Sequence, residues 1–201
     1  MFNKVLIANR GEIAIRAFRA AYELGADTVA VFPYEDRNSL HRLKADESYQ
    51  IGVPGHPVRA YLSVDEIIGA ALHSGADAVY PGYGFLSENT AFAAACEEAG
   101  IAFLGPGSRA IETMGDKITA KTAVSAFDVP VVPGLARPGL SDDELVAAAS
   151  EVGFPVLIKP SAGGGGKGMH VVERAEDMAD AVARARREAA SSFGDDTLFL
   201  E

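Results

Sequence analysis

A glycine-rich stretch at residues 155–169 constrains the fold of this chain more than any other feature. The apolar run 156–158 leads to Lys159, and five glycines then occupy six positions, with Lys167 between the fourth and the fifth. The apolar run predicts a buried strand, and extended chain resumes after the glycines. Glycines let backbone N–H groups turn around an anion without interference from a Cβ atom. Because two ammonium groups flank these amides, the stretch predicts a flexible hairpin lid that closes over a polyphosphate.

Two other interpretations of this stretch are disfavoured. A P-loop needs Gly six residues before its Lys and Ser or Thr directly after it, but Ser161 and Gly168 stand at these places around Lys167. A P-loop also opens a helix, whereas this loop runs into a second strand. A Gly-rich linker seldom lies between two apolar β runs with a lysine at each end.

Composition limits the classes of partner. The chain has 201 residues, enough for one large domain or two small ones, and 48% of them are hydrophobic. Its net charge of −10, from 18 basic and 28 acidic residues, argues against nucleic acid or an anionic membrane as partner. No apolar run approaches the roughly 18 residues of a membrane helix. Residues 1–4 pass directly into a strand, so we expect no signal peptide and a cytoplasmic protein.

The cysteine and the histidines predict neither a disulfide nor a structural metal. Cys96 is the single cysteine and lies among alanines, so we expect a small buried residue. The spacing of the four histidines is not that of metal ligands. These are His41, His56, His73 and His170.

The first half of the chain predicts a doubly wound parallel sheet. Strands at 5–8 and 28–32 flank a helical pattern that ends at Gly25, which makes a β-α-β unit. The turn 9–12 is not the dinucleotide-binding GxGxxG. A further strand at 78–80 leads into the loop 81–89, where two glycines would present Tyr83 at the carboxyl edge of the sheet, the place where open α/β folds bind ligands. A tight turn with a packed tyrosine is the equal alternative.

Helix signals place further elements. Capping boxes at 63–66 and 141–144 each predict a helix start, and Asp116 predicts a helix that runs through Phe127. Residues 176–190 read as a helix and 197–201 as a strand. Because an apolar strand is an unusual end for a chain, we expect a truncated chain or the first part of a longer polypeptide.

Three segments occur in order at one family's spacing: residues 8–14, residues 114–117 and the glycine-rich lid. With them the chain resembles the biotin carboxylase component of biotin-dependent carboxylases over all 201 residues. The resemblance implies an α/β fold in which a doubly wound amino-terminal domain precedes part of an ATP-grasp domain. The expected domains are 1–115, a connector helix at 116–134 and an incomplete ATP-grasp lid subdomain at 135–201. The family's reaction converts ATP, bicarbonate and biotin into carboxybiotin, ADP and phosphate.

The resemblance also implies roles for single residues. Lys117 and Lys159 would contact the phosphates of ATP, Gly165 and Gly166 would donate lid amides, and Glu201 would lie at the adenine–ribose edge. Tyr83 would belong to the biotin pocket. The carboxylates for Mg²⁺, the bicarbonate-binding residues and the catalytic base would all follow Glu201. Catalytic residues are therefore unknown within this chain, and we expect the chain alone to be inactive.

The partners implied are ATP, bicarbonate, a biotin carrier domain or protein, and a carboxyltransferase. Arg19 and Glu23 match positions at the family's homodimer interface, although a surface i,i+4 salt bridge is an equal alternative. Segments up to residue 89 look like pyruvate carboxylases, and residues 115–201 look like acyl-CoA carboxylase α subunits, so the carboxyl acceptor stays open. Another ATP-grasp ligase and a non-catalytic dimerisation or regulatory module are the remaining alternatives.

Overall fold

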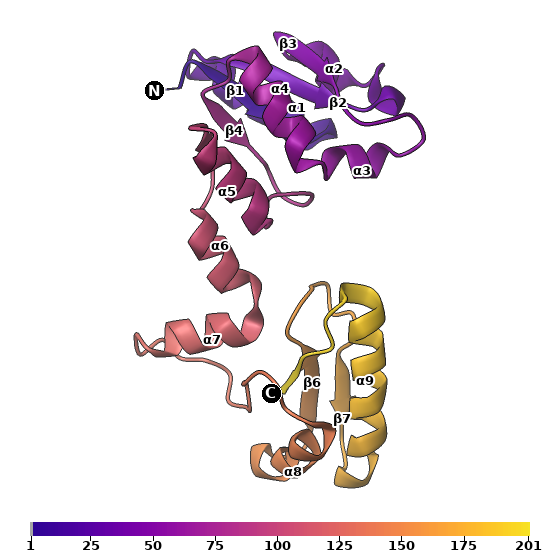
Figure 1. Cartoon of the computed structure of the whole chain (residues 1–201). Coiled ribbons are helices and arrows are strands. Elements are labelled where there is room, and N and C mark those ends of the chain that lie inside the picture. Colours follow the sequence, from indigo (N-terminus) through magenta and orange to yellow (C-terminus); the bar gives the residue numbers. More distant parts are fainter. Residues whose placement is uncertain (1) are drawn as a thin grey trace. The chain divides into compact units, whose positions relative to one another are not determined.

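The computed structural model describes residues 2–201, and their contacts divide the chain into two compact units, Met1–Glu112 and Thr113–Glu201 (Figure 1). The boundary falls within helix α6 (Ser108–Gly115). Each unit has its own buried apolar cores, so each is described by itself.

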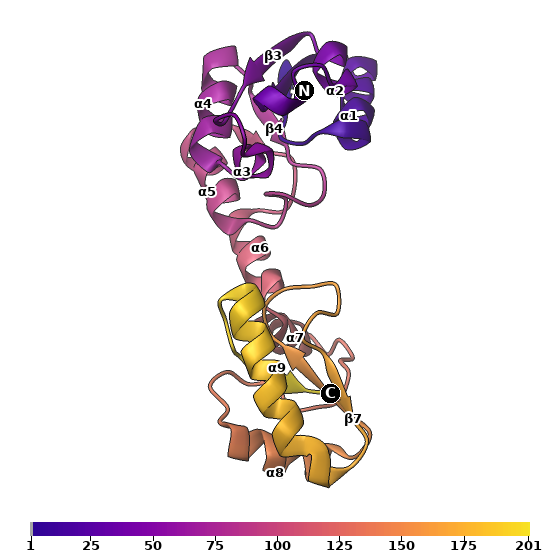
Figure 2. The ribbon, with the colours of Figure 1, turned by 90° about the vertical axis from the view of Figure 1, so that its right-hand side faces the viewer.

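The first unit is built on a five-stranded parallel sheet in the order β3-β2-β1-β4-β5. Helix α1 covers one face, and α4 and α5 cover the other (Figure 2). The side chains of β1 alternate between the faces: Val5 and Ile7 pack with α1, and Leu6 packs with α4 and α5. A sheet that is buried on both faces explains the nearly continuous apolar runs of the sequence, and the doubly wound prediction is confirmed. The strands are β1 (Lys4–Ile7), β2 (Asp27–Phe32), β3 (Glu47–Gln50), β4 (Ala78–Tyr80) and β5 (Ala102–Phe103).

The helices of the first unit connect these strands. The α-helices are α1 (Gly11–Glu23), α2 (Leu40–Lys44), α3 (Pro57–Tyr61), α4 (Val64–Ser74) and α5 (Thr90–Glu98), and η1 (Tyr34–Asp36) is a 3₁₀ turn. Cys96 is fully buried, as expected, among the residues that α5 packs against the sheet.

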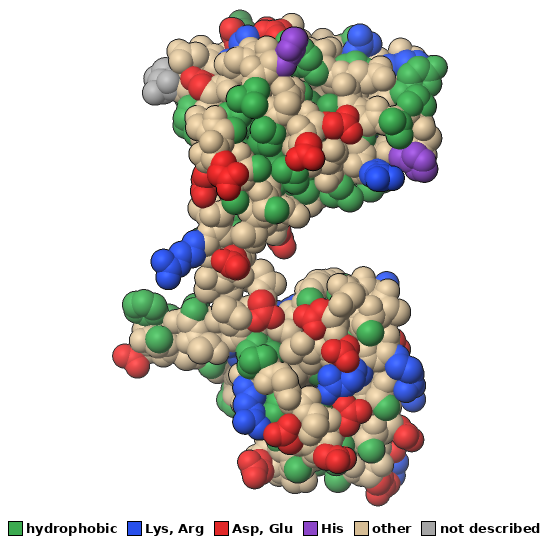
Figure 3. All heavy atoms as spheres, in the orientation of Figure 1, with side chains coloured by type: hydrophobic (Ala, Val, Ile, Leu, Met, Phe, Trp, Pro, Cys, Tyr) green, Lys and Arg blue, Asp and Glu red, His purple; other side chains and the backbone are tan. Residues whose placement is uncertain are grey.

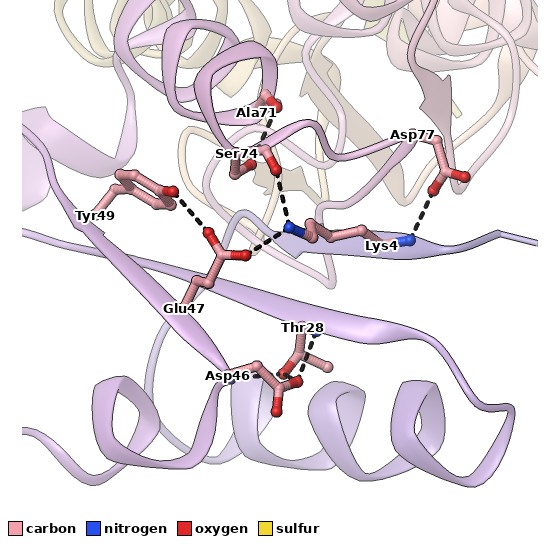
Figure 4. Close-up of polar contacts among 8 residues, drawn as sticks. All are labelled: Lys4, Thr28, Asp46, Glu47, Tyr49, Ala71, Ser74 and Asp77. Atoms are coloured by element: carbon pink, nitrogen blue, oxygen red, sulfur yellow. Dashed lines mark hydrogen bonds and ion pairs between the residues drawn. The ribbon is translucent and has the colours of Figure 1, made fainter.

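A polar network fixes the amino-terminal edge of the sheet (Figure 4). The Lys4 ammonium donates to Glu47 at 2.5 Å, which joins β1 to β3, and the Lys4 backbone N–H donates to Asp77 ahead of β4 at 3.0 Å. Asp46 accepts from both the backbone N–H and the hydroxyl of Thr28 on β2, at 2.9 and 2.7 Å. With this edge closed by side chains, the longer loops gather at the carboxyl edge.

The second unit packs two helices on one face of a three-stranded antiparallel sheet in the order β7-β6-β8. Its strands are β6 (Val156–Pro160), β7 (His170–Val172) and β8 (Leu198–Leu200). Burial alternates along β6: Val156, Ile158 and Pro160 face the helices, while Leu157 and Lys159 face the other way. The helices are α7 (Lys117–Ser125), α8 (Asp142–Val152), the 3₁₀ turn η2 (Ala175–Asp177) and α9 (Met178–Phe193).

The predicted helix starts can be compared with the capping bonds in the structure. The capping box at Ser141 is present, with both reciprocal bonds to Glu144. The helix start predicted at residues 63–66 is confirmed, since α4 begins at Val64 with Ser63 as its N-cap residue, but the capping box does not form: the Ser63 side chain makes no cap bond, and Glu66 instead accepts from the Gly52 N–H at 2.5 Å. Asp116 caps α7 through the Thr119 N–H at 2.7 Å. Helix α7 ends at Ser125, two residues before the end expected from sequence. Helix α9 begins at Met178, two residues after the expected start.

Within residues 2–201 no helix combines the length and apolar character that crossing a bilayer requires. On the face that Figure 3 shows, acidic and basic side chains are interspersed over both units.

Candidate functional site

The glycine-rich loop joins β6 to β7 as the hairpin expected from sequence. The two strands pair antiparallel, with Val156 opposite Val172 and Ile158 opposite His170. Because the loop returns into a strand, its amides are not arranged as in a P-loop, whose glycines lead into a helix. The loop therefore projects from the sheet as a lid.

Close packing holds the two ends of the lid. Gly163 has φ +77°, and a Cβ atom added there would overlap the ring of Phe193 on α9. Gly168 has φ +74°, and an added Cβ would lie 2.9 Å from Pro160 Cγ. Both positions thus require glycine for space as well as for backbone conformation.

The middle of the lid makes no close packing contacts. Gly165 and Gly166 have φ of +71° and +78°, and an added Cβ would meet nothing closer than 3.8 Å. Within the described residues, the N–H groups of residues 163–168 make no hydrogen bond of ordinary geometry to protein acceptors. Lys167 is exposed at this tip. These unused donors, next to a cation, are suited to an anionic ligand.

A cation–carboxylate cluster lies at the base of the hairpin, on the sheet face opposite α8 and α9. The Lys159 ammonium donates to Glu201 Oε2, and the Lys121 ammonium of α7 donates to Glu201 Oε1 at 2.5 Å. The side chains of Lys121, Lys159 and Glu201 are 17%, 21% and 10% exposed. Sequence reasoning singled out Lys159 and Glu201 but missed Lys121.

Backbone pairing and charge together hold Glu201 in place. Its N–H and C=O exchange hydrogen bonds with Leu157 at 3.0 and 2.7 Å, which continues the pairing of β8 with β6. Burial raises the pKa of the Glu201 carboxyl, but the hydrogen bonds and charges of Lys121 and Lys159 outweigh burial, and the net pKa lies below its ordinary value. The carboxylate is therefore ionised at neutral pH.

Lys117 lies at the other side of the lid's base. Its ammonium donates to the carbonyls of Ser161, at 3.1 Å, and of Gly163. The neighbouring Asp116 accepts from the Ser161 hydroxyl, and that hydroxyl is buried. Residues 116 and 117 thus tie the start of α7 to the first residues of the lid.

In the first unit, the turn after β1 and the loop after β4 meet at the carboxyl edge. Asn9 is fully buried, and its amide donates to the carbonyls of Pro81 and Tyr83 at 2.8 and 3.0 Å. Gly82 has φ +68° and lies so close to Asn9 and Ile13 that a Cβ would not fit. The two segments that sequence reasoning singled out separately are therefore one structural feature.

Tyr83 projects from this edge and is 61% exposed. Its hydroxyl donates to Glu12 at 2.6 Å, and this hydrogen bond raises the pKa of the phenol. Of the two alternatives for this residue, the presented ring agrees with the structure better than the packed one.

Arg19 and Glu23 form an exposed i,i+4 ion pair on α1, with 3.1 Å between Nε and Oε1. A second pair, which sequence reasoning did not find, joins Arg10 to the buried Asp36 through bonds of 2.8 and 2.6 Å, and Tyr61 donates to the same carboxylate at 2.8 Å. Among residues 2–201, no group of three or more His, Cys, Asp and Glu is placed to hold a metal ion.

Comparison with known proteins shows the family. The family model for the biotin carboxylase N-terminal domain matches residues 1–111, which is more than half of the chain. The chain belongs to the biotin carboxylase family. The family model for the ATP-binding domain of the carbamoyl-phosphate synthase L chain matches residues 116–201 of this biotin carboxylase chain.

Curated relatives of this biotin carboxylase chain include several pyruvate carboxylases. The chain is 52% identical over 202 residues to that of Schizosaccharomyces pombe and 50% identical over 200 residues to pyruvate carboxylase 1 of Caenorhabditis elegans. Each match covers 100% of this chain but 17% of the relative. The similarity to pyruvate carboxylases thus extends through residues 115–201, the part expected from its motifs to look more like acyl-CoA carboxylase α subunits.

Solved structures of the same family match the whole chain. The biotin carboxylase domain dimer of Hydrogenobacter thermophilus 2-oxoglutarate carboxylase, in complex with MgADP, ADP and bicarbonate, has a TM-score of 0.94 at 46% identity. Biotin carboxylase from Campylobacter jejuni has a TM-score of 0.93 at 41% identity. This chain covers 44% and 45% of those chains, so it corresponds to less than half of a biotin carboxylase domain.

Proposed function

We propose that this chain is the amino-terminal part of an enzyme that uses ATP and bicarbonate to carboxylate biotin. The observation that carries the proposal is the lid: a hairpin with free amides at its tip and the Lys159–Glu201 pair at its base, in a chain of this family. The relatives support a 2-oxo acid such as pyruvate as the final carboxyl acceptor.

The residues present fit a nucleoside triphosphate. Lys159 and Lys117 would bind phosphate oxygens, and Gly165 and Gly166 would donate their free N–H groups when the lid closes. Closure would exclude water from the reacting phosphate. Glu201 would face the adenine–ribose end. Mg²⁺, when bound, would neutralise the phosphate charge, and its ligands would come from residues outside this chain.

The remaining assignments complete this proposal. Residues 1–115 would form the biotin carboxylase amino-terminal domain, 116–134 the connector and 135–201 the incomplete lid subdomain. Tyr83 would border the biotin pocket, and Arg19 and Glu23 would exchange their pairing for contacts with a second copy in a homodimer. A biotin carrier and a carboxyltransferase would be the other partners. The cytoplasmic location stays a prediction.

The test is carboxylation of free biotin by the enzyme that contains this chain, followed with ¹⁴C-labelled bicarbonate. We expect fixation of label that requires both ATP and biotin, and at least a tenfold loss for the Lys159→Gln variant because a charge-assisted phosphate contact is removed. ATP consumption that requires bicarbonate but not biotin would favour another ATP-grasp ligase. Absence of ATP consumption would favour the non-catalytic module.

A further inference from the structure

Lys121 holds one end of the carboxylate that Lys159 also holds. Its ammonium contacts Glu201 Oε1 at 2.5 Å and the Val132 carbonyl at 2.9 Å, and it lies 5.5 Å from the centre of the Phe199 ring. Three contacts therefore fix an otherwise flexible side chain that extends from α7: the Glu201 carboxylate, the Val132 carbonyl and the Phe199 ring.

The charge count of the cluster depends on Lys121. A Lys159–Glu201 pair alone is neutral, and a neutral pair attracts a phosphate weakly. With Lys121 the cluster of two ammonium groups and one carboxylate has a net charge of +1, and the carboxylate divides its charge between two partners. At 10–21% exposure these charges are screened less than those on an open surface.

We propose that Lys121 is a positioning residue for nucleotide binding: it holds Oε1 of Glu201, so the carboxylate divides its charge between two ammonium groups, and the Lys159 ammonium, which donates to Oε2, keeps N–H donors and positive charge for a phosphate. This inference rests on the proposed function, since it assigns Lys159 to the phosphates of ATP. Lys121 itself touches Glu201, the Val132 carbonyl and Phe199, and it acts on the nucleotide through Glu201.

The experiment compares ATP with adenosine as ligands of the 201-residue chain, by NMR titration, which measures weak binding. Loss of the Lys121 charge acts on the phosphates, so Lys121→Met should raise the dissociation constant for ATP about 3- to 10-fold and change that for adenosine by less than about twofold. Lys121→Gln keeps hydrogen-bond donors but loses the charge, and it should behave like Lys121→Met. Lys121→Arg should restore ATP binding to within about twofold of wild type.

Two controls separate the mechanism from simpler causes. Lys44→Met removes the same charge from an exposed position in the first unit and should leave both affinities unchanged. In the Glu201→Gln background, removing Lys121 should weaken ATP binding clearly less than it does in the wild type, because the carboxylate through which Lys121 acts is absent and only its through-space charge remains. A Lys121 effect that persists at full size in that background would overturn the positioning role.

The outcomes distinguish this inference from the proposed function. Equal losses for ATP and adenosine, or failure of Lys121→Arg to restore binding, would show that Lys121 only supports the structure around Glu201. Unchanged ATP binding in Lys121→Met and Lys121→Gln would refute the inference while leaving the proposed function intact. A wild-type chain that binds adenosine but gains nothing from the phosphates of ATP would refute both.

Discussion

Replacement of Asn9 tests whether the two loops at the carboxyl edge depend on one buried amide. The Asn9 side chain is fully buried, donates to the carbonyls of Pro81 and Tyr83 at 2.8 and 3.0 Å, and accepts from the Arg10 N–H at 2.8 Å. Asn9→Ala removes three hydrogen bonds and leaves buried groups without partners. Each such bond contributes about 1 kcal/mol net, so the free energy of unfolding should fall by about 2–4 kcal/mol.

The assay is urea denaturation of the 201-residue chain followed by circular dichroism, with thermal melts in parallel. For a domain of about 100 residues, 1 kcal/mol corresponds to about 4–8 °C, so the melting temperature should fall by at least about 8 °C. Asn9→Asp should destabilise more than Asn9→Ala, because a carboxylate would face two carbonyl oxygens at the positions that Nδ2 now serves as a donor. Asn38→Ala, at an exposed position, is the matched control and should change stability by less than about 0.5 kcal/mol.

The reasoning would be refuted by an Asn9→Ala variant that unfolds within about 0.5 kcal/mol of wild type. Equal stability of Asn9→Asp and Asn9→Ala would also refute it. That result would show that the two N–H donors of the Asn9 amide do not contribute to stability. In either case the turn after β1 and the loop after β4 would be held by their own backbone geometry.

Three further predictions concern the lid and the acid side of the stability curve. In the enzyme that contains this chain, Lys159→Gln should lower kcat/KM for ATP roughly 10- to 150-fold, because a contact of about 1.5–3 kcal/mol is lost. Replacement of the exposed Lys167 by Gln should keep kcat/KM within about tenfold of the wild-type value. Equal losses for the two variants would show that Lys167 is a fixed phosphate ligand. Amide exchange in the lid glycines should slow when ATP is added, and exchange that is equally slow in both states would argue against a mobile lid. Burial raises the pKa of the Asp36 carboxyl, but Arg10 and its other hydrogen-bond donors lower it further, so the net pKa is below its ordinary value. The stability that this pair contributes is therefore complete above the unfolded pKa of about 3.9 and is lost as the pH falls through the folded pKa. Urea denaturation at pH 3–6 should show that the stability of Asp36→Asn depends less on pH than that of the wild type. Identical pH profiles would contradict this prediction.

Sequence patterns predict the elements well because local signals set them. The apolar runs of β1 and β2, the helical spacing between them and the glycines of the lid each depend on residues close in the chain, and all three appear in the structure. The glycines also predict more than flexibility: Gly163 and Gly168 are needed for close packing, which only the position of α9 and Pro160 shows.

Contacts between distant residues are what sequence reasoning misses. Lys121 is one of two lysines on the helix predicted after Asp116, and its role becomes visible only because Glu201, 80 residues later, lies beside it. Likewise, Asp36 and Arg10 are 26 residues apart and carry no shared pattern. At Ser63 the local signal predicts the start of α4 correctly but not its bonds, because Glu66 accepts from the distant Gly52 N–H instead of the Ser63 N–H.

The transfer of oxygen from bicarbonate to phosphate tests the central claim most directly. In the proposed reaction a bicarbonate oxygen attacks the γ-phosphate of ATP beneath the lid, so that oxygen leaves with the phosphate product. The enzyme that contains this chain, supplied with ¹⁸O-bicarbonate, ATP and biotin, should release phosphate that carries ¹⁸O from bicarbonate, as read by mass spectrometry, and the 201-residue chain alone should release none. Phosphate labelled only from ¹⁸O-water in the whole enzyme, or bicarbonate-dependent phosphate release by the 201-residue chain, would contradict the account.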